Sequence, residues 1–283
     1  MKAQIAIEKV SSKLLRPWIG NFVSKKRISQ GFFARLVQDL NGVFEGRHIG
    51  YLSSSDLSNF LANQDNRNFR RVIVAGGSDY DPTLSDYRLL IEMKSTRFYI
   101  QNLNFPETEL VKSLPIGVED YRWARNAMPW NFSQRMIERE KLPLVLVGPF
   151  GATHPERERC LQGVTHSQVC EVYEDRIPNW TYSKLSSKYL FVACPRGNGL
   201  DTHRFWETIY RGSIPVVIQS NWAKNMKSYG IPMVTISDWW EIDRAIADFK
   251  ESLMGTNPNY LSPKWWRERF IRDLLDQRLP LQG

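Results

Sequence analysis

The residues best suited to chemistry lie in the segment 189–218, which reads YLFVACPRGNGLDTHRFWETIYRGSIPVVI. A run of apolar and β-branched residues predicts a buried strand that ends near Cys194. A loop with two glycines follows, then a helix over 202–211, and then a second apolar strand from Ile214. In parallel α/β sheets, ligands bind beyond the carboxyl ends of the strands, so we expect this loop to lie at a binding site.

The composition of this loop favours an anionic ligand. Free backbone N–H groups and the dipole at the start of a helix attract phosphate, and glycines let the backbone approach it closely. Arginines can add charge-assisted hydrogen bonds, and a carboxylate about one and a half turns into the helix can accept hydrogen bonds from ribose hydroxyls. We therefore predict a site for a phosphate-bearing ligand formed by Arg196, Gly197, Asn198, Gly199, Asp201, Thr202, Arg204 and Glu207.

Several of these residues also have a purely structural interpretation. Asp201 can serve only as a helix cap, and Arg196 can be a surface loop residue. Glu207 can pair with His203 or Arg211 on a solvated helix face. The loop is not a Walker loop, because no Gly-Lys-Ser/Thr follows, and it lacks the third glycine of the dinucleotide fingerprint. The missing fingerprint disfavours a Rossmann-type oxidoreductase.

The run over 190–218 resembles the C-terminal signature of exostosin-like glycosyltransferases: a strand ending in Cys-Pro, a glycine-containing loop, a helix of Arg-Phe-Trp-Glu type and then Gly-Ser-Ile-Pro-Val-Val-Ile. The α1,3-fucosyltransferases have a similar segment, so the donor sugar stays open. The resemblance implies a GT-B fold, in which two Rossmann-like domains face a cleft. It also implies that Glu207 binds the nucleotide ribose and that Arg196 or Arg204 binds the diphosphate. The activity it implies is transfer of a sugar from a UDP- or GDP-sugar to a glycan or lipid-linked saccharide, with no metal cofactor.

A second loop, over 148–159, follows a predicted strand over 142–147. In the GT-B arrangement this loop faces the cleft. We assign Gly148 and Arg157 to the donor site on this basis, with His154 as another possible contact to phosphate. A charged helix start explains the same residues almost as well.

An inverting transfer needs a base that deprotonates the acceptor hydroxyl. Asp79, in the loop after a predicted strand over 71–75, and Glu119 are the two candidates from the first half of the chain. Residues 79–81 spell Asp-x-Asp, but that metal motif belongs to a different, single-domain architecture. Asp81 is followed by proline, which suits a turn or a helix start.

Apolar strands alternate with helices along most of the chain, which predicts parallel sheets covered on both faces. We expect the α/β class, with an acceptor-binding Rossmann-like domain over 1–140 and a nucleotide-sugar-binding one over 141–258. A final helix over 263–279, within the segment 259–283, is expected to pack back on the first domain. In the first domain we also predict helices over 57–62 and 106–111 and strands over 98–101 and 112–118.

The net charge of +8 favours an anionic partner: a phosphate ligand, an anionic membrane surface or nucleic acid. The segment 1–30 fits either a helix packed on the first domain or a basic amphipathic helix at a membrane surface. No apolar run is long enough to cross a bilayer, no secretory signal is evident, and the three cysteines fit reduced thiols. We therefore expect a cytoplasmic protein, with or without contact to the inner face of a membrane.

A nucleic-acid-binding α/β protein is the alternative, suggested by the charge and the ten tryptophans. Trp206, Trp239 and Trp266 fall in amphipathic helices, where a core position is the better interpretation. We therefore favour glycosyl transfer, with a nucleotide sugar and a saccharide acceptor as partners and no nucleic acid.

Overall fold

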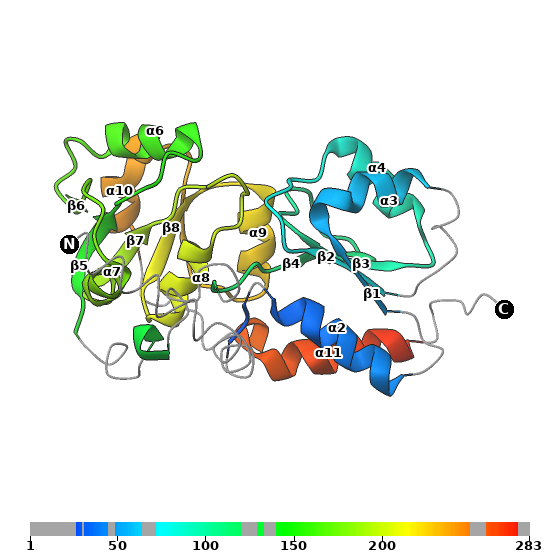
Figure 1. Ribbon diagram of the computed structural model, residues 1–283. Coiled ribbons are helices and arrows are strands. Elements are labelled where there is room, and N and C mark those ends of the chain that lie inside the picture. Colours follow the sequence, from blue (N-terminus) through cyan, green and yellow to red (C-terminus); the bar gives the residue numbers. More distant parts are fainter. Residues whose placement is uncertain are drawn as a thin grey trace.

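The structure is a computed structural model, and it describes residues 27–29, 31–44, 49–63, 72–119, 129–132, 140–249 and 259–276. In this part of the chain two parallel β-sheets, each with helices on both faces, form two adjacent domains (Figure 1). The predicted α/β class with two parallel sheets is confirmed.

The first domain is built on a four-stranded sheet in the order β1-β2-β3-β4. Its strands are β1 (Ile49–Ser53), β2 (Val72–Gly76), β3 (Arg97–Gln101) and β4 (Val111–Leu114), all parallel. Its helices are α3 (Leu57–Ala62) and α4 (Leu84–Glu92) on one face, and α2 (Phe32–Val43) and α11 (Pro263–Leu275) on the other (Figure 1). Successive β2 residues alternate between these faces, since Ile73 packs with α3 and α4 while Val74 packs with α2 and α11.

The second domain has a five-stranded parallel sheet in the order β6-β5-β7-β8-β9. The strands are β5 (Leu142–Val147), β6 (Cys170–Val172), β7 (Tyr189–Ala193), β8 (Ile214–Ile218) and β9 (Val234–Ile236). The helices are α6 (Pro155–Gly163) and α10 (Ile242–Ala247) on one face, and α7 (Asn179–Ser186), α8 (His203–Tyr210) and α9 (Asn221–Ser228) on the other. This is a doubly wound order whose direction reverses between β5 and β7, so a ligand crevice is expected beyond those two strands.

The first domain departs from the sequence prediction in four elements. Helices α2 and α4 and strand β1 were not predicted. The helix expected over 106–111 is wrong: residues 106–110 form a loop, and Val111 begins β4. Glu107 from this loop accepts a hydrogen bond from the Ser113 N–H, which ties the loop to the edge strand.

The apolar core is continuous between the two domains. Tyr260 packs on Tyr229 of α9 with ring centroids 4.2 Å apart and on Trp266 of α11 at 4.8 Å. It also lies 6.2 Å from Trp206 of α8, and its hydroxyl donates to the Ser113 carbonyl of β4. The contact between domains is thus a shared aromatic core, which restricts large relative movement.

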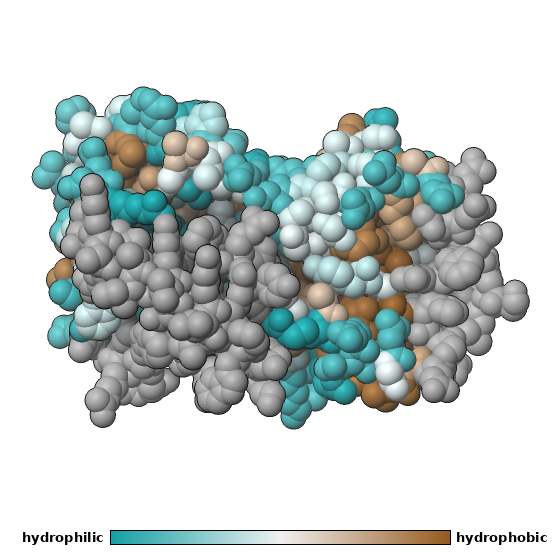
Figure 2. All heavy atoms as spheres, in the orientation of Figure 1, coloured by the Kyte–Doolittle hydropathy of each residue, from teal (hydrophilic) through white to brown (hydrophobic). Residues whose placement is uncertain are grey.

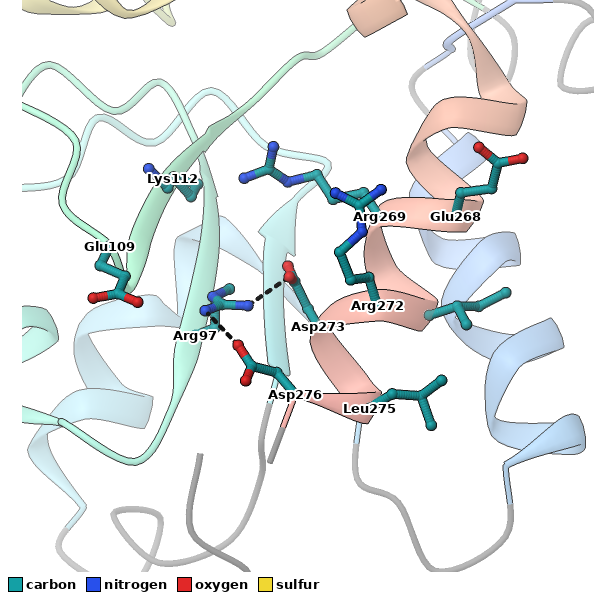
Figure 3. Close-up of a pocket in the computed structure, with 10 residues that line it drawn as sticks. Arg97, Glu109, Lys112, Glu268, Arg269, Arg272, Asp273, Leu275 and Asp276 are labelled. Carbon is teal, nitrogen blue, oxygen red and sulfur yellow. Dashed lines mark hydrogen bonds and ion pairs between the residues drawn. The ribbon is translucent and has the colours of Figure 1, made fainter. Parts of the chain in front are cut away.

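Helix α11 is fixed to the first sheet by a buried ion pair. Asp273 accepts hydrogen bonds from the Arg97 guanidinium at 2.5 Å and from the Tyr99 hydroxyl, and Arg97 also reaches Asp276 at 3.4 Å (Figure 3). Arg97, Asp273 and Asp276 border a charged cavity of about 820 Å³ between α11 and the β3–β4 edge. Helix α11, predicted over 263–279, ends at Leu275. Residues after 276 lie outside the described part.

Among the described helices, none combines the length and the apolar character that a membrane span requires. The predicted N-terminal helix falls on residues 1–30, of which the structure describes only 27–29.

We predict that Asp273→Ala destabilises the protein by about 3 kcal/mol, because it leaves the buried Arg97 with a single weaker partner. Asp39→Ala is the matched control, since its pair with Arg267 on the same helix is 3.9 Å long and exposed. Asp39→Ala is expected to lower the free energy of unfolding by less than about 1 kcal/mol. Urea unfolding of both variants measures this, and equal losses would contradict the assignment.

Candidate functional site

The loop over 194–202, which joins β7 to α8 and is called the glycine loop below, lies where the two domains meet (Figure 1). It contacts three segments of the first domain that follow β2, β3 and β4. Figure 2 shows that the molecular surface dips between the two domains at the top of the view. The carboxyl ends of the two sheets therefore converge at the glycine loop, as the switch point between β5 and β7 leads one to expect.

Two carboxylates of the first domain accept hydrogen bonds from the glycine loop. The Arg196 guanidinium forms an ion pair with Asp81, and the Leu200 N–H donates to the other oxygen of Asp81 at 3.2 Å. The Asn198 amide donates to Asp79 at 3.2 Å. The loop thus binds anionic oxygen through an arginine and a backbone amide, the donor set expected of a phosphate site.

Asp201 holds the two domains together instead of capping α8. It is 2% exposed, and its oxygens accept hydrogen bonds from the Ile116 N–H at 2.8 Å and the Trp206 indole N–H at 2.7 Å. The helix cap is Thr202, whose side chain accepts from the Phe205 N–H. Burial raises the pKa of Asp201 to about 7, against the lowering effect of those hydrogen bonds. Both of its oxygens are occupied by protein donors, and its assignment to the donor site stays a prediction.

Asn102 completes this contact from the first domain. Its backbone adopts a left-handed φ of 59°, which asparagine tolerates better than most residues. Its side chain accepts from the Asp201 N–H at 2.8 Å and donates to the Tyr80 carbonyl at 3.1 Å. A Cβ at Gly199 would lie 2.8 Å from the Asn102 amide, so the glycine is required for close approach of the two domains.

His203 and Glu119 form a second pair across the junction. The Nδ1 of His203 lies 2.8 Å from the Gly117 carbonyl, which can only accept, so Nδ1 carries a hydrogen. Its Nε2 lies 3.6 Å from the carboxylate oxygen Oε2 of Glu119. Glu119 is 6% exposed. Burial lowers the pKa of His203, but Glu119 and the Gly117 carbonyl outweigh it, and the net pKa lies above the ordinary 6.5.

Arg204 and Arg157 lie at the base of the glycine loop. Arg204 donates to the Gly148 carbonyl at 3.1 Å and the Pro149 carbonyl at 2.7 Å. Arg157 donates to the Arg196 carbonyl at 3.1 Å. Burial, followed by the charge of Arg204, lowers the pKa of Arg157 to about 10. The structure thus gathers the predicted basic residues from both loops at the switch point.

Other predicted residues of the second domain have structural partners. Gly148 has φ of 75°, and a Cβ there would lie 2.2 Å from the Tyr173 carbonyl. His154 caps α6 by accepting from the Glu156 N–H. Gly197 is buried beside Arg157, where a Cβ would lie 3.0 Å from the guanidinium.

Glu207 pairs with Arg211 at 3.5 Å, as one structural interpretation held, but both residues are buried and not on a solvated face. Arg211 also reaches the Asn131 carbonyl and the Ser183 hydroxyl. The contact of Glu207 with ribose stays a prediction.

The residues that sequence reasoning missed are those that make the domain contact, above all Asp81, Asn102 and His203. The proline after Asp81 predicts a turn or a helix start at this position, and that pattern does not reveal its contact across the junction. Asn102 directly follows a predicted strand, and polar residues at the carboxyl ends of parallel strands are a signal that finds such positions. The charged cavity beside α11 is a separate place, because no residue of the glycine loop lines it.

No family model matches the chain. A comparison with curated proteins finds a Caenorhabditis elegans protein named Exostosin-1 homolog, 33% identical over 93 residues. The match covers 31% of this chain and 22% of that protein, so the chain shares about a fifth of its relative's length. The similarity supports the exostosin-like resemblance, and that to fucosyltransferases stays a prediction.

We predict that the stability of the domain junction falls as the pH rises from 6 to 8. Protonated His203 stabilises the fold below its unfolded pKa, and this contribution is lost as the pH rises through the higher folded pKa. The raised pKa of Asp201 acts in the same direction, because its folded form favours the proton up to about pH 7.

His203→Gln is expected to reduce this pH dependence, so its melting temperature should fall less between pH 6 and pH 8 than that of the wild-type chain. His166→Gln, at an exposed position, is the control. Thermal melts at pH 6 and pH 8 measure the effect, and an unchanged slope in His203→Gln would contradict it.

Proposed function

We propose that this chain is a glycosyltransferase that transfers a sugar from a UDP- or GDP-sugar to a glycan or lipid-linked saccharide. The observation that carries the proposal is the binding of the Asp81 carboxylate by the Leu200 N–H and the Arg196 guanidinium. These donors hold an anion at the switch point of a doubly wound sheet, beside the loops of a second parallel sheet. The similarity to a protein named Exostosin-1 homolog supports the same class.

In this proposal the glycine loop binds the diphosphate of the donor. Arg196 supplies a charged fork that fits phosphate oxygens in a bidentate way, and the Leu200 N–H adds a fixed dipole. Arg157 and Arg204 lie behind the loop and raise the local positive potential. Stabilising the charge that develops on the leaving diphosphate is the catalytic task of such a site.

The acceptor binds on the first domain, in the proposal, at the loop that carries Asp79. Asp79 is exposed and accepts a hydrogen bond from the Asn198 amide at 3.2 Å. Because of this exposure, an acceptor hydroxyl can reach it. Glu119, the other candidate, is almost fully buried and faces His203. If the transfer inverts configuration, Asp79 is the better placed base.

The nucleic-acid alternative finds less support in the described side chains. Trp206, Trp239 and Trp266 are at most 1% exposed, which confirms their expected core positions. Bases stack on exposed aromatic rings, and these rings are not available for that. The absence of a metal requirement, the cytoplasmic location and the membrane contact of the N-terminal segment stay predictions.

We predict that Arg196→Ala weakens binding of UDP or GDP at least about tenfold, since it removes a charge-assisted hydrogen bond to phosphate. Arg159→Ala is the control, because this arginine lies on α6 with its side chain 68% exposed and pairs with Asp238. Isothermal titration with UDP and GDP decides the point. Failure of the wild-type chain to bind either nucleotide would overturn the proposed function.

For the base, Asp79→Asn is expected to lower turnover by about 10²- to 10⁴-fold while leaving nucleotide affinity nearly unchanged. Release of UDP or GDP from the matching sugar nucleotide, with acceptor present, gives the turnover. Normal turnover in Asp79→Asn together with a loss in Glu119→Gln would assign the base to Glu119.

A further inference from the structure

The contact between Asp81 and the glycine loop has the form of a bound ligand. One oxygen of the carboxylate receives the Leu200 N–H, and the other receives the Arg196 guanidinium. These are the donors that the proposed function assigns to the diphosphate. A carboxylate and a phosphate group compete for such donors because both present anionic oxygens to a charged fork and an amide.

Asp81 is held at this position by a rigid support. The buried carboxylate of Asp86, 4% exposed, accepts hydrogen bonds from the Tyr80 hydroxyl at 2.6 Å and the Thr83 N–H at 2.8 Å. It also accepts from the Ser58 hydroxyl at 2.7 Å. These bonds fix the residues on both sides of Asp81, so its carboxylate reaches the glycine loop from a preorganised turn.

The pair is nonetheless exchangeable. The side chains of Arg196 and Asp81 are 20% and 34% exposed, in contrast to the fully enclosed Asp201 nearby. A partly exposed ion pair stabilises the fold by only a small free energy. A ligand that carries more negative charge than one carboxylate can therefore displace Asp81 from these donors. Because the domains share an aromatic core, the exchange needs only movement of the loop and its side chains.

Resting on the proposed function, we propose that Asp81 is an internal competitor for the diphosphate site. In the ligand-free chain its carboxylate occupies the donors of Arg196 and Leu200, and the diphosphate of the donor displaces it. After transfer, the return of Asp81 to these donors promotes release of the nucleoside diphosphate product. Asp81 thus sets nucleotide affinity without taking part in the chemical step.

The test is isothermal titration of UDP and of GDP into the wild-type chain and Asp81→Asn. The neutral amide is a weaker competitor and no longer repels the diphosphate, so the variant is expected to bind about threefold or more tightly than wild type. Glu92→Gln is the charge-matched control, because Glu92 is exposed at the end of α4, and it should bind as wild type does.

A second variant, Asp81→Ser, covers the case in which the asparagine variant does not fold, and the same increase in affinity is expected. Equal or weaker binding by the folded Asp81 variants, with binding still lost in Arg196→Ala, would overturn the competitor role and leave the proposed function standing. Absence of UDP and GDP binding in all variants, wild type included, would overturn both.

Discussion

Two carboxylates cross the junction between the domains in opposite directions, and the candidate site depends on both. Asp81 of the first domain takes donors from the glycine loop, and Asp201 of that loop takes the Ile116 N–H of the first domain. These contacts hold the loop against the carboxyl ends of the first sheet. The place where a ligand of a doubly wound sheet is expected is therefore also the place where the domains meet.

The two carboxylates differ in burial. We infer from this difference that Asp201 maintains the domain contact and that Asp81 regulates ligand binding. Asp201 is enclosed, has both oxygens satisfied, and belongs to the permanent contact. Asp81 is partly open to solvent, and so is the Arg196 side chain with which it shares the loop contact, beside the Leu200 N–H. Since the aromatic core around Tyr260 already joins the domains, the Asp81 contact can exchange without loss of the fold.

The sequence was sufficient for the elements around the glycine loop, where the predicted strands and the helix over 202–211 correspond to β5, β7, α8 and β8. It failed in the first domain for α2, β1 and α4. A proline misled the prediction over 106–111, where Glu107 holds a loop by accepting hydrogen bonds from the Ser113 N–H and from the distant Tyr229 hydroxyl. The sequence reveals the glycine loop because its glycines, arginines and helix start lie within one short segment. Its partners Asp81 and Asn102 come from positions about a hundred residues away, and no local pattern pairs them.

A crystal structure of the chain with UDP or GDP bound is the most direct test of the central claim. The account predicts diphosphate oxygens within hydrogen-bond distance of the Leu200 N–H and the Arg196 guanidinium, with the Asp81 carboxylate moved away from both. A nucleotide bound elsewhere while Asp81 keeps its contacts with the loop would contradict it.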